Sequence, residues 1–140
     1  MKILLDTANI STIKEILPFF PIAGFTTNPS ILARESADVK QTLEAMRDLA
    51  DGKRMVHAQV TATTAEDILE QAKRLQDFMG PNFYAKIPIT LQGMRAIPMC
   101  KAAGIHVTVT AIFTPMQALM ACMAGADFVA PYVDLIGWIT

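Results

Sequence analysis

The sequence predicts an α/β fold in which βα units repeat around a parallel sheet. Short apolar or β-branched runs alternate with segments of helical periodicity from one end of the chain to the other. No linker, charge block or low-complexity tract interrupts this alternation. Because 140 residues are the size of one ordinary domain, we expect a single domain over residues 1–140 with about six parallel βα units.

The first half of the chain supplies three of these units. Their strands cover residues 2–5, 22–25 and 55–60. Asn9 or Ser11 can cap the first helix, and Pro29 suits a helix start after the second strand. After the third strand, Thr63 and Glu66 have capping-box spacing, which predicts the beginning of another helix.

The second half continues the pattern, with strands over residues 83–89, 105–110 and 127–133. Gly104 can end the helix between the first two of these strands. Pro98 lies inside that helix, where a proline typically costs ~3 kcal/mol. Pro115 begins the next helix, whose apolar face is formed by Met116, Leu119, Met120 and Met123. Residues 134–140 form a divergent tail.

Composition argues against several classes of function. The formal net charge is −1 with both signs scattered, so we expect neither a nucleic-acid partner nor binding to an anionic membrane. The uncharged stretch 107–126 contains Pro115 and Gln117, which favours a buried strand and helix over a membrane span. The short apolar N-terminus meets Asp6 at once, so we expect a cytoplasmic protein. Cysteine and histidine spacing predicts no metal site.

Polar side chains occur where each predicted strand ends. The set consists of Asp6, Thr26, Asn28, Gln59, Lys86, Thr110 and Tyr132. The carboxyl ends of parallel strands gather at one rim, which in a (β/α) barrel is where reacting groups converge. The alternation of side chains along a strand also allows Lys86 and Gln59 to point inward while their apolar neighbours meet the helices.

Lys86 is a single charge inside an otherwise apolar strand, and three interpretations of it compete. Its ammonium points to water from the strand end, is a buried partner of Asp6, or is a nucleophilic amine. Burial lowers the pKa of a lysine, so that a fraction is the free amine and attacks carbonyl carbons. The polar rim favours the nucleophile, because the resulting iminium draws electrons from a carbon–carbon bond as aldol cleavage requires.

The other rim residues fit supporting roles in such a reaction. Tyr132 is a candidate acid/base, acting through a water held by Gln59 and Thr110, and Asp6 and Asn28 are candidates to bind hydroxyls. Each has a plainer alternative. Asp6 and Asn28 are also typical of helix caps and turns, and the other three of satisfied polar or packing positions in a strand. Thr26 is a further candidate for substrate binding.

Several stretches resemble the small transaldolase family: "LLDTAN", "AGFTTNPSIL", "HAQVTATTAE", "YAKIPIT" and the run from Gly104 to Val133. The resemblance implies a (β/α)8 TIM barrel with a Schiff-base lysine at Lys86. It also implies acid/base or donor-binding roles for Asp6, Asn28, Gln59, Thr110 and Tyr132, no cofactor, and a homo-oligomer. Gln59 and Tyr132 resemble the branch that cleaves fructose 6-phosphate to dihydroxyacetone and glyceraldehyde 3-phosphate. Transaldolases proper have glutamate and phenylalanine there.

The resemblance has limits at the C-terminal side. A family barrel has eight strands, whereas about six are predicted here, and Asp134 and Leu135 replace an Asn-Arg pair whose arginine helps bind phosphate in the family. We therefore expect a C-terminally truncated chain. Three functions follow as hypotheses: a class I aldolase, a transaldolase of the pentose phosphate pathway that transfers a dihydroxyacetone unit, or an inactive chain that only oligomerises.

Overall fold

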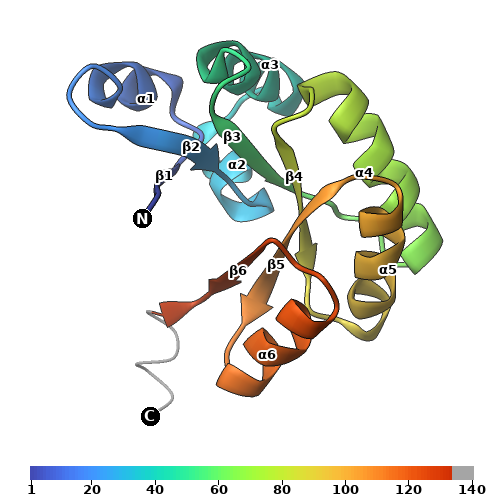
Figure 1. Ribbon diagram of the computed structural model, residues 1–140. Helices are drawn as coiled ribbons and strands as arrows, with labels where there is room; N and C mark the ends of the chain where they lie inside the picture. Colours follow the sequence, from blue (N-terminus) through green and yellow to red (C-terminus); the bar gives the residue numbers. More distant parts are fainter. Residues whose placement is uncertain (134–140) are drawn as a thin grey trace.

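The computed structural model describes residues 1–133 of the chain (Figure 1). Its elements, in chain order, are β1 (Ile3–Asp6), α1 (Ile10–Ile16), β2 (Ile22–Thr26), α2 (Pro29–Glu35), α3 (Val39–Ala50), β3 (Met55–Gln59), α4 (Ala65–Met79), β4 (Phe83–Pro88), α5 (Leu91–Ala102), β5 (His106–Ile112), α6 (Pro115–Met123) and β6 (Phe128–Pro131). The predicted tail, residues 134–140, lies outside the described residues. Within 1–133, none of the helices is both long and apolar enough to cross a membrane.

The sheet has six strands in the order β1-β2-β3-β4-β5-β6, and every neighbouring pair is parallel. The sheet curls, and α1, α3, α4, α5 and α6 lie along its outer side (Figure 1). Sequential order with parallel pairing is the arrangement of a (β/α) barrel. The prediction of an incomplete (β/α) barrel is therefore confirmed, with six parallel strands, five of which are followed by a helix within residues 1–133.

Burial along the strands shows where the core lies. In β4, Phe83, Ala85 and Ile87 are all buried toward the helices, whereas Tyr84 and Lys86 alternate with them and face the inner side of the sheet. The strands β2 to β5 are mostly buried. In the described part of the chain β1 and β6 have a neighbour on one side only, and they are half-buried or exposed along their length. The core therefore fills the layer between the middle strands and the helices.

Polar caps fix where the helices begin. Asn9 caps α1, as one of the two predicted alternatives, by accepting from the Thr12 backbone N–H. The capping box expected at Thr63 and Glu66 is wrong by one residue. Thr64 is the cap of α4, and its hydroxyl oxygen accepts from the backbone N–H of Asp67. The error arose because threonines occupy both positions, and Thr64 is the one whose side chain caps the helix.

The helix α5 runs without interruption through Pro98. Pro98 is exposed and therefore lies on the solvent side of the helix. A proline there removes one hydrogen bond to the preceding turn, and the curved outer side of a helix tolerates this loss best. Gly104 has a φ of +75°, which suits a residue with no side chain just after the helix end.

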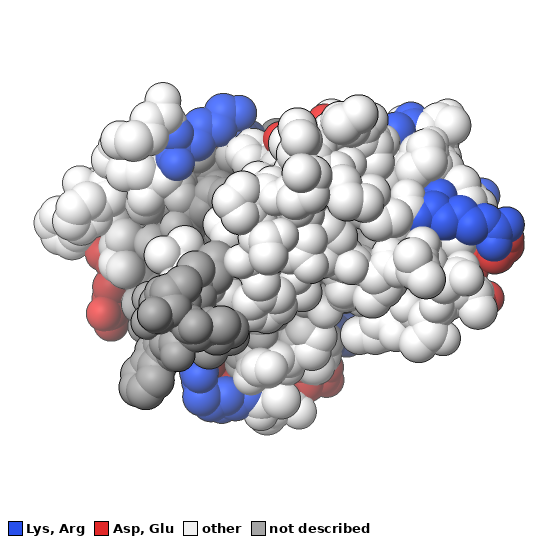
Figure 2. All heavy atoms as spheres, turned by 90° about the horizontal axis from the view of Figure 1, so that it is seen from below, with Lys and Arg blue, Asp and Glu red and all other residues white. Residues whose placement is uncertain are grey.

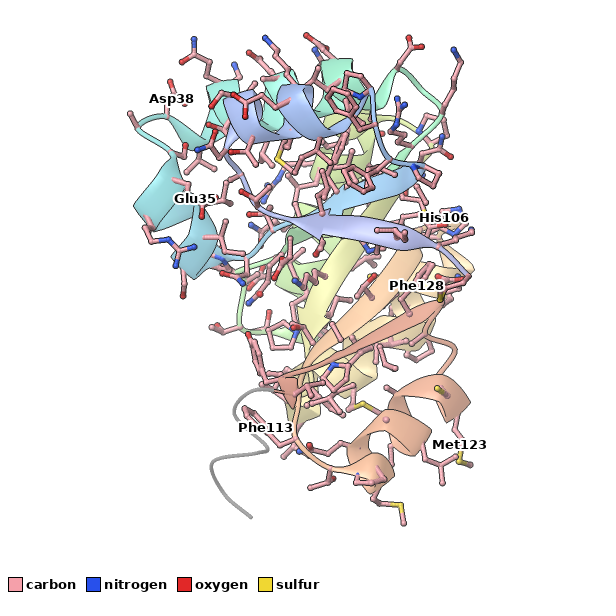
Figure 3. All side chains as sticks on the ribbon, turned by 90° about the vertical axis from the view of Figure 1, so that its left-hand side faces the viewer. Glu35, Asp38, His106, Phe113, Met123 and Phe128 are labelled. Atoms are coloured by element: carbon pink, nitrogen blue, oxygen red, sulfur yellow. The ribbon has the colours of Figure 1, made fainter. Side chains whose placement is uncertain are left out.

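The helix α6 buries only Ala121. Its apolar face of Met116, Leu119, Met120 and Met123 is exposed, and Met123 is 80% exposed. Figure 3 shows the Met123 side chain directed away from the body of the molecule. Seen from below, the molecule presents a broad uncharged surface on the side where α6 lies (Figure 2). The helix was predicted correctly, but its most apolar face does not meet the sheet.

Candidate active site

The six strand ends bring the predicted polar residues to one rim. Asp6 and Thr26 are the last residues of β1 and β2 and lie opposite each other in the register. Gln59 ends β3 and lies opposite Lys86 of β4. Thr110 lies near the end of β5, and Tyr132 directly follows β6. The predicted placement at the carboxyl ends is therefore confirmed by the fold, while the roles of these residues remain proposals.

Lys86 is only 5% exposed. Its Nζ donates to the Thr26 Oγ1 and to the Thr27 carbonyl oxygen, each at 3.1 Å. Within residues 1–133 it forms no ion pair with a carboxylate closer than 4.0 Å, so the interpretation as a tight partner of Asp6 does not describe this structure. Burial lowers the pKa of Lys86, and the negative charge of Asp6 opposes this in part.

The β2 end also positions Asn28 and fixes one of its two polar atoms. The Asn28 Oδ1 accepts from the Ile31 backbone N–H at 2.8 Å and caps α2. The cap interpretation of Asn28 is thus realised. The carboxamide nitrogen remains as the group able to donate to a substrate hydroxyl.

Gln59 is half-buried, and its Oε1 is buried without a hydrogen-bond partner in the described part of the chain. An unpaired buried acceptor is costly unless a water or ligand completes it. Gln59 also lines a cleft of about 540 Å³ together with Thr61, Pro88 and Thr90, and Lys86 is not among the residues that line it. The Gln59 Oε1 is therefore an acceptor that the described residues leave unpaired.

Thr110 and Tyr132 lie at the β5 and β6 ends. Thr110 is buried, and its carbonyl accepts from the Ile89 backbone N–H at 3.0 Å. The register shifts just after Thr110, where Ala111 has a φ of +61°. The Tyr132 backbone N–H donates to the Ile112 carbonyl, and its ring lies 5.5 Å from that of Phe113. No direct hydrogen bond joins Tyr132 to Gln59 or Thr110 among the described residues, so their predicted link depends on a water.

A second polar layer under Lys86 was given no role from the sequence. His57, two residues before Gln59 on β3, is 1% exposed, and its Nδ1 is 2.8 Å from the Thr108 Oγ1. The His57 ring stacks on Tyr84, and Phe128 meets both rings edge-on. Burial, with a smaller effect of the Lys86 charge, lowers the pKa of His57 to about 4. The sequence could have indicated this layer, because His57 and Tyr84 lie two residues before Gln59 and Lys86 and therefore face the same inner side of the sheet.

One solved structure shares the fold over most of the chain. The crystal structure of KGPDC from Streptococcus mutans superposes with a TM-score of 0.54 at 14% sequence identity. The match covers 92% of this chain and 64% of that one. At this identity the likeness concerns the fold alone.

Two curated relatives are much more similar in sequence. A probable transaldolase of Desulforudis audaxviator (strain MP104C) is 42% identical over 133 residues, which are 95% of this chain and 60% of the relative. A probable fructose-6-phosphate aldolase of Streptococcus pneumoniae (strain ATCC 700669 / Spain 23F-1) is 39% identical over 135 residues, 96% of this chain and 61% of the relative. The chain thus spans about three fifths of the length of these relatives.

A family model covers nearly the whole chain as well. The model described as Transaldolase/Fructose-6-phosphate aldolase matches residues 3–137, and so runs past Val133. This match agrees with the names of both relatives. The chain belongs to the transaldolase/fructose-6-phosphate aldolase family.

Proposed function

We propose that the chain provides the lysine centre of a class I aldolase that reversibly cleaves fructose 6-phosphate to dihydroxyacetone and glyceraldehyde 3-phosphate. The observation that carries this proposal is a 5% exposed lysine whose pKa is lowered by burial, at a rim lined with hydroxyl and amide groups. Gln59 and Tyr132, which resemble the aldolase branch, support this reaction over a transfer.

The chemistry begins with the free amine of Lys86. Its nitrogen attacks the ketone carbon of the substrate, and the carbinolamine takes up a proton and loses water to leave a protonated imine. The C4 hydroxyl then gives its proton to a base while the C3–C4 bond breaks and its electron pair moves toward the iminium. The aldehyde leaves, and protonation at C3 followed by hydrolysis releases dihydroxyacetone and the amine.

The remaining rim residues supply proton transfer and orientation in this proposal. Tyr132 moves the proton at the C4 oxygen and at C3, through a water bound by Gln59 and Thr110. Asp6 and the Asn28 carboxamide nitrogen bind hydroxyls of the three-carbon unit. The unpaired Gln59 Oε1 supports the water-binding role, because such a water would satisfy it. A cytoplasmic location and a homo-oligomer remain predictions.

Trapping of the imine tests this proposal. Borohydride in the presence of fructose 6-phosphate or dihydroxyacetone should reduce the imine to a stable adduct on Lys86, located by peptide mass spectrometry. Lys86→Met should abolish the adduct, whereas Lys14→Met, which removes an exposed lysine of α1, should leave it unchanged. Equal trapping in Lys86→Met and the wild type would exclude Lys86 as the nucleophile, and no trapping in the wild type would favour the inactive chain.

Transaldolase activity is the second candidate, because the 42% identical relative is named a probable transaldolase. The two activities share the imine and differ in the fate of the three-carbon unit. An aldolase releases free dihydroxyacetone from fructose 6-phosphate without an acceptor. If no free dihydroxyacetone forms and the three-carbon unit is only transferred to erythrose 4-phosphate, the activity is that of a transaldolase.

A further inference from the structure

We infer that Thr26 and Thr27 form a two-acceptor clamp that aims the lone pair of the Lys86 amine, so that Thr26 is a positioning residue for the nucleophile. This inference rests on the proposed Schiff-base function and reassigns Thr26, which the sequence suggested as a substrate ligand. The clamp is defined as the Thr26 Oγ1 and the Thr27 carbonyl oxygen, both 3.1 Å from the Lys86 Nζ.

The clamp is held in place by the strands and the helix around it. Thr26 is the last residue of β2, so its backbone is held by the sheet, and its β-branched side chain has few rotamers. Thr27 is fully buried, and its backbone N–H donates to the His57 carbonyl of β3 at 3.0 Å, which fixes the peptide on one side. Asn28 fixes the other side by capping α2. The Thr27 carbonyl therefore has little freedom to follow a moving amine, and the Thr26 hydroxyl starts from a fixed backbone position.

Hydrogen counting shows what the clamp does to the amine. A neutral amine has two N–H bonds and one lone pair in tetrahedral arrangement, and the clamp accepts both hydrogens. The lone pair then takes the remaining direction, away from the β2 end. In the ammonium form the third hydrogen occupies that direction, so deprotonation exposes the lone pair there. Attack on a carbonyl requires this alignment.

The clamp also fits the product of the attack. The protonated imine keeps a single N–H, and either acceptor can hold it, so the bond is retained while the other acceptor is released. Acceptors favour the charged form of an amine, so the clamp does not itself lower the pKa of Lys86. Burial lowers the pKa of Lys86, and the negative charge of Asp6 on β1 opposes this effect. His57 on β3 is neutral above a pKa of about 4 and leaves this balance unchanged near pH 7.

Because burial sets the pKa of Lys86 and the clamp sets its orientation, Thr26→Val should change the reactivity of the amine without raising its pKa. This substitution keeps the side-chain shape and removes the acceptor. The rate of imine trapping should rise with pH to a plateau where Lys86 is fully neutral. The plateau should be about tenfold lower in Thr26→Val, as for the loss of one oriented hydrogen bond, and the midpoint should not move to higher pH. Thr26→Ser, which keeps the hydroxyl, should match the wild type.

A substrate-free measurement separates this inference from the proposed function. Competitive acetylation of Lys86 by a small reagent, followed by mass spectrometry across pH, reports both the pKa and the plateau reactivity of the amine. A lower plateau in Thr26→Val that Thr26→Ser restores supports the clamp, even if no ketone is trapped and the aldolase proposal fails. A plateau within twofold of the wild type in Thr26→Val, or an equal loss in Thr26→Ser, would overturn the clamp. Thr26→Ala provides a second test with the same expected loss.

Discussion

At the scale of single residues, Tyr132 offers the sharpest test of proton transfer. Tyr132→Phe removes the phenolic hydroxyl but keeps the ring next to Phe113. We expect cleavage of fructose 6-phosphate to slow by about 10² or more, as is typical when an acid/base group is lost. The borohydride adduct on Lys86 should still form. Equal cleavage rates in the variant and the wild type would remove Tyr132 from the mechanism.

His57 should make the folded state more stable as pH rises from about 4 to 6.5. Its pKa is lowered from 6.5 to about 4, so the unfolded chain binds a proton that the folded chain excludes. The stability is complete above the unfolded pKa and is lost as pH falls toward the folded pKa. Between pH 7 and pH 5 we expect a loss of about 2 kcal/mol, measured by urea unfolding.

His57→Phe gives the control for this pH dependence. Phenylalanine keeps a flat ring for stacking on Tyr84 and cannot titrate. The wild type and the variant share His106 and all carboxylates, so the difference between their two pH profiles isolates His57. Parallel profiles from pH 7 to pH 5 would show that His57 is not kept neutral by the fold.

Lys86 could be predicted from the sequence, and its partners could not. A lysine in an apolar strand stands out because burying an ammonium is costly. The contacts with Thr26 and Thr27 depend on how far the curled sheet brings the β2 end toward β4. Sequence spacing does not contain that curvature. The hydrogen bond between His57 and Thr108 was missed for the same reason, since it spans the inner face from β3 to β5.

At the scale of elements, Pro98 should lower the stability of α5. Its side chain is exposed, so replacement by alanine loses little packing and restores a backbone donor. We expect Pro98→Ala to raise the free energy of unfolding by about 1–2 kcal/mol, less than the ~3 kcal/mol typical of an interior proline, because proline also restricts the unfolded chain. Denaturant titration at pH 7 measures the change.

Leu91→Ala is a matched substitution in the same helix. Leu91 is 91% exposed at the first position of α5, so its replacement should change stability by no more than about 0.5 kcal/mol. A gain for Pro98→Ala that is no larger than this would show that α5 absorbs the proline at no cost.

Periodicity identified α6 but not its orientation. The spacing of Met116, Leu119, Met120 and Met123 marks one face, which by itself predicts contact with the sheet. The structure instead buries the small Ala121, and the larger side chains are exposed. Hydrophobic periodicity tells which residues share a face, whereas small residues decide how closely a helix can approach a strand.

At the scale of the whole molecule, the strands β1 and β6 differ from the four strands between them. Among the described residues each has a neighbour on one side only, and both are half-buried or exposed along their length. Backbone groups without a partner strand exchange with water more readily. We expect amide hydrogens of β1 and β6 to exchange at least about tenfold faster than those of β3 and β4, measured by mass spectrometry.

Slow amide exchange in β1 and β6 would instead indicate that these two edge strands are covered. Slow exchange in β1 and β6, together with a molecular mass above that of one chain in solution, would show that copies pair through them. Fast exchange with the mass of one chain would contradict the predicted homo-oligomer.

The strictly consecutive order of the strands also bears on how the chain acquires its structure during synthesis. Within residues 1–133, each strand from β2 to β5 pairs with the strand made just before it and the strand made just after it, β1 pairs with β2, and β6 pairs with β5. Among the described strands, each strand from β2 to β6 therefore finds the earlier strand that it pairs with already made when it leaves the ribosome. The described sheet can therefore form from its amino-terminal strand onward, one strand after another.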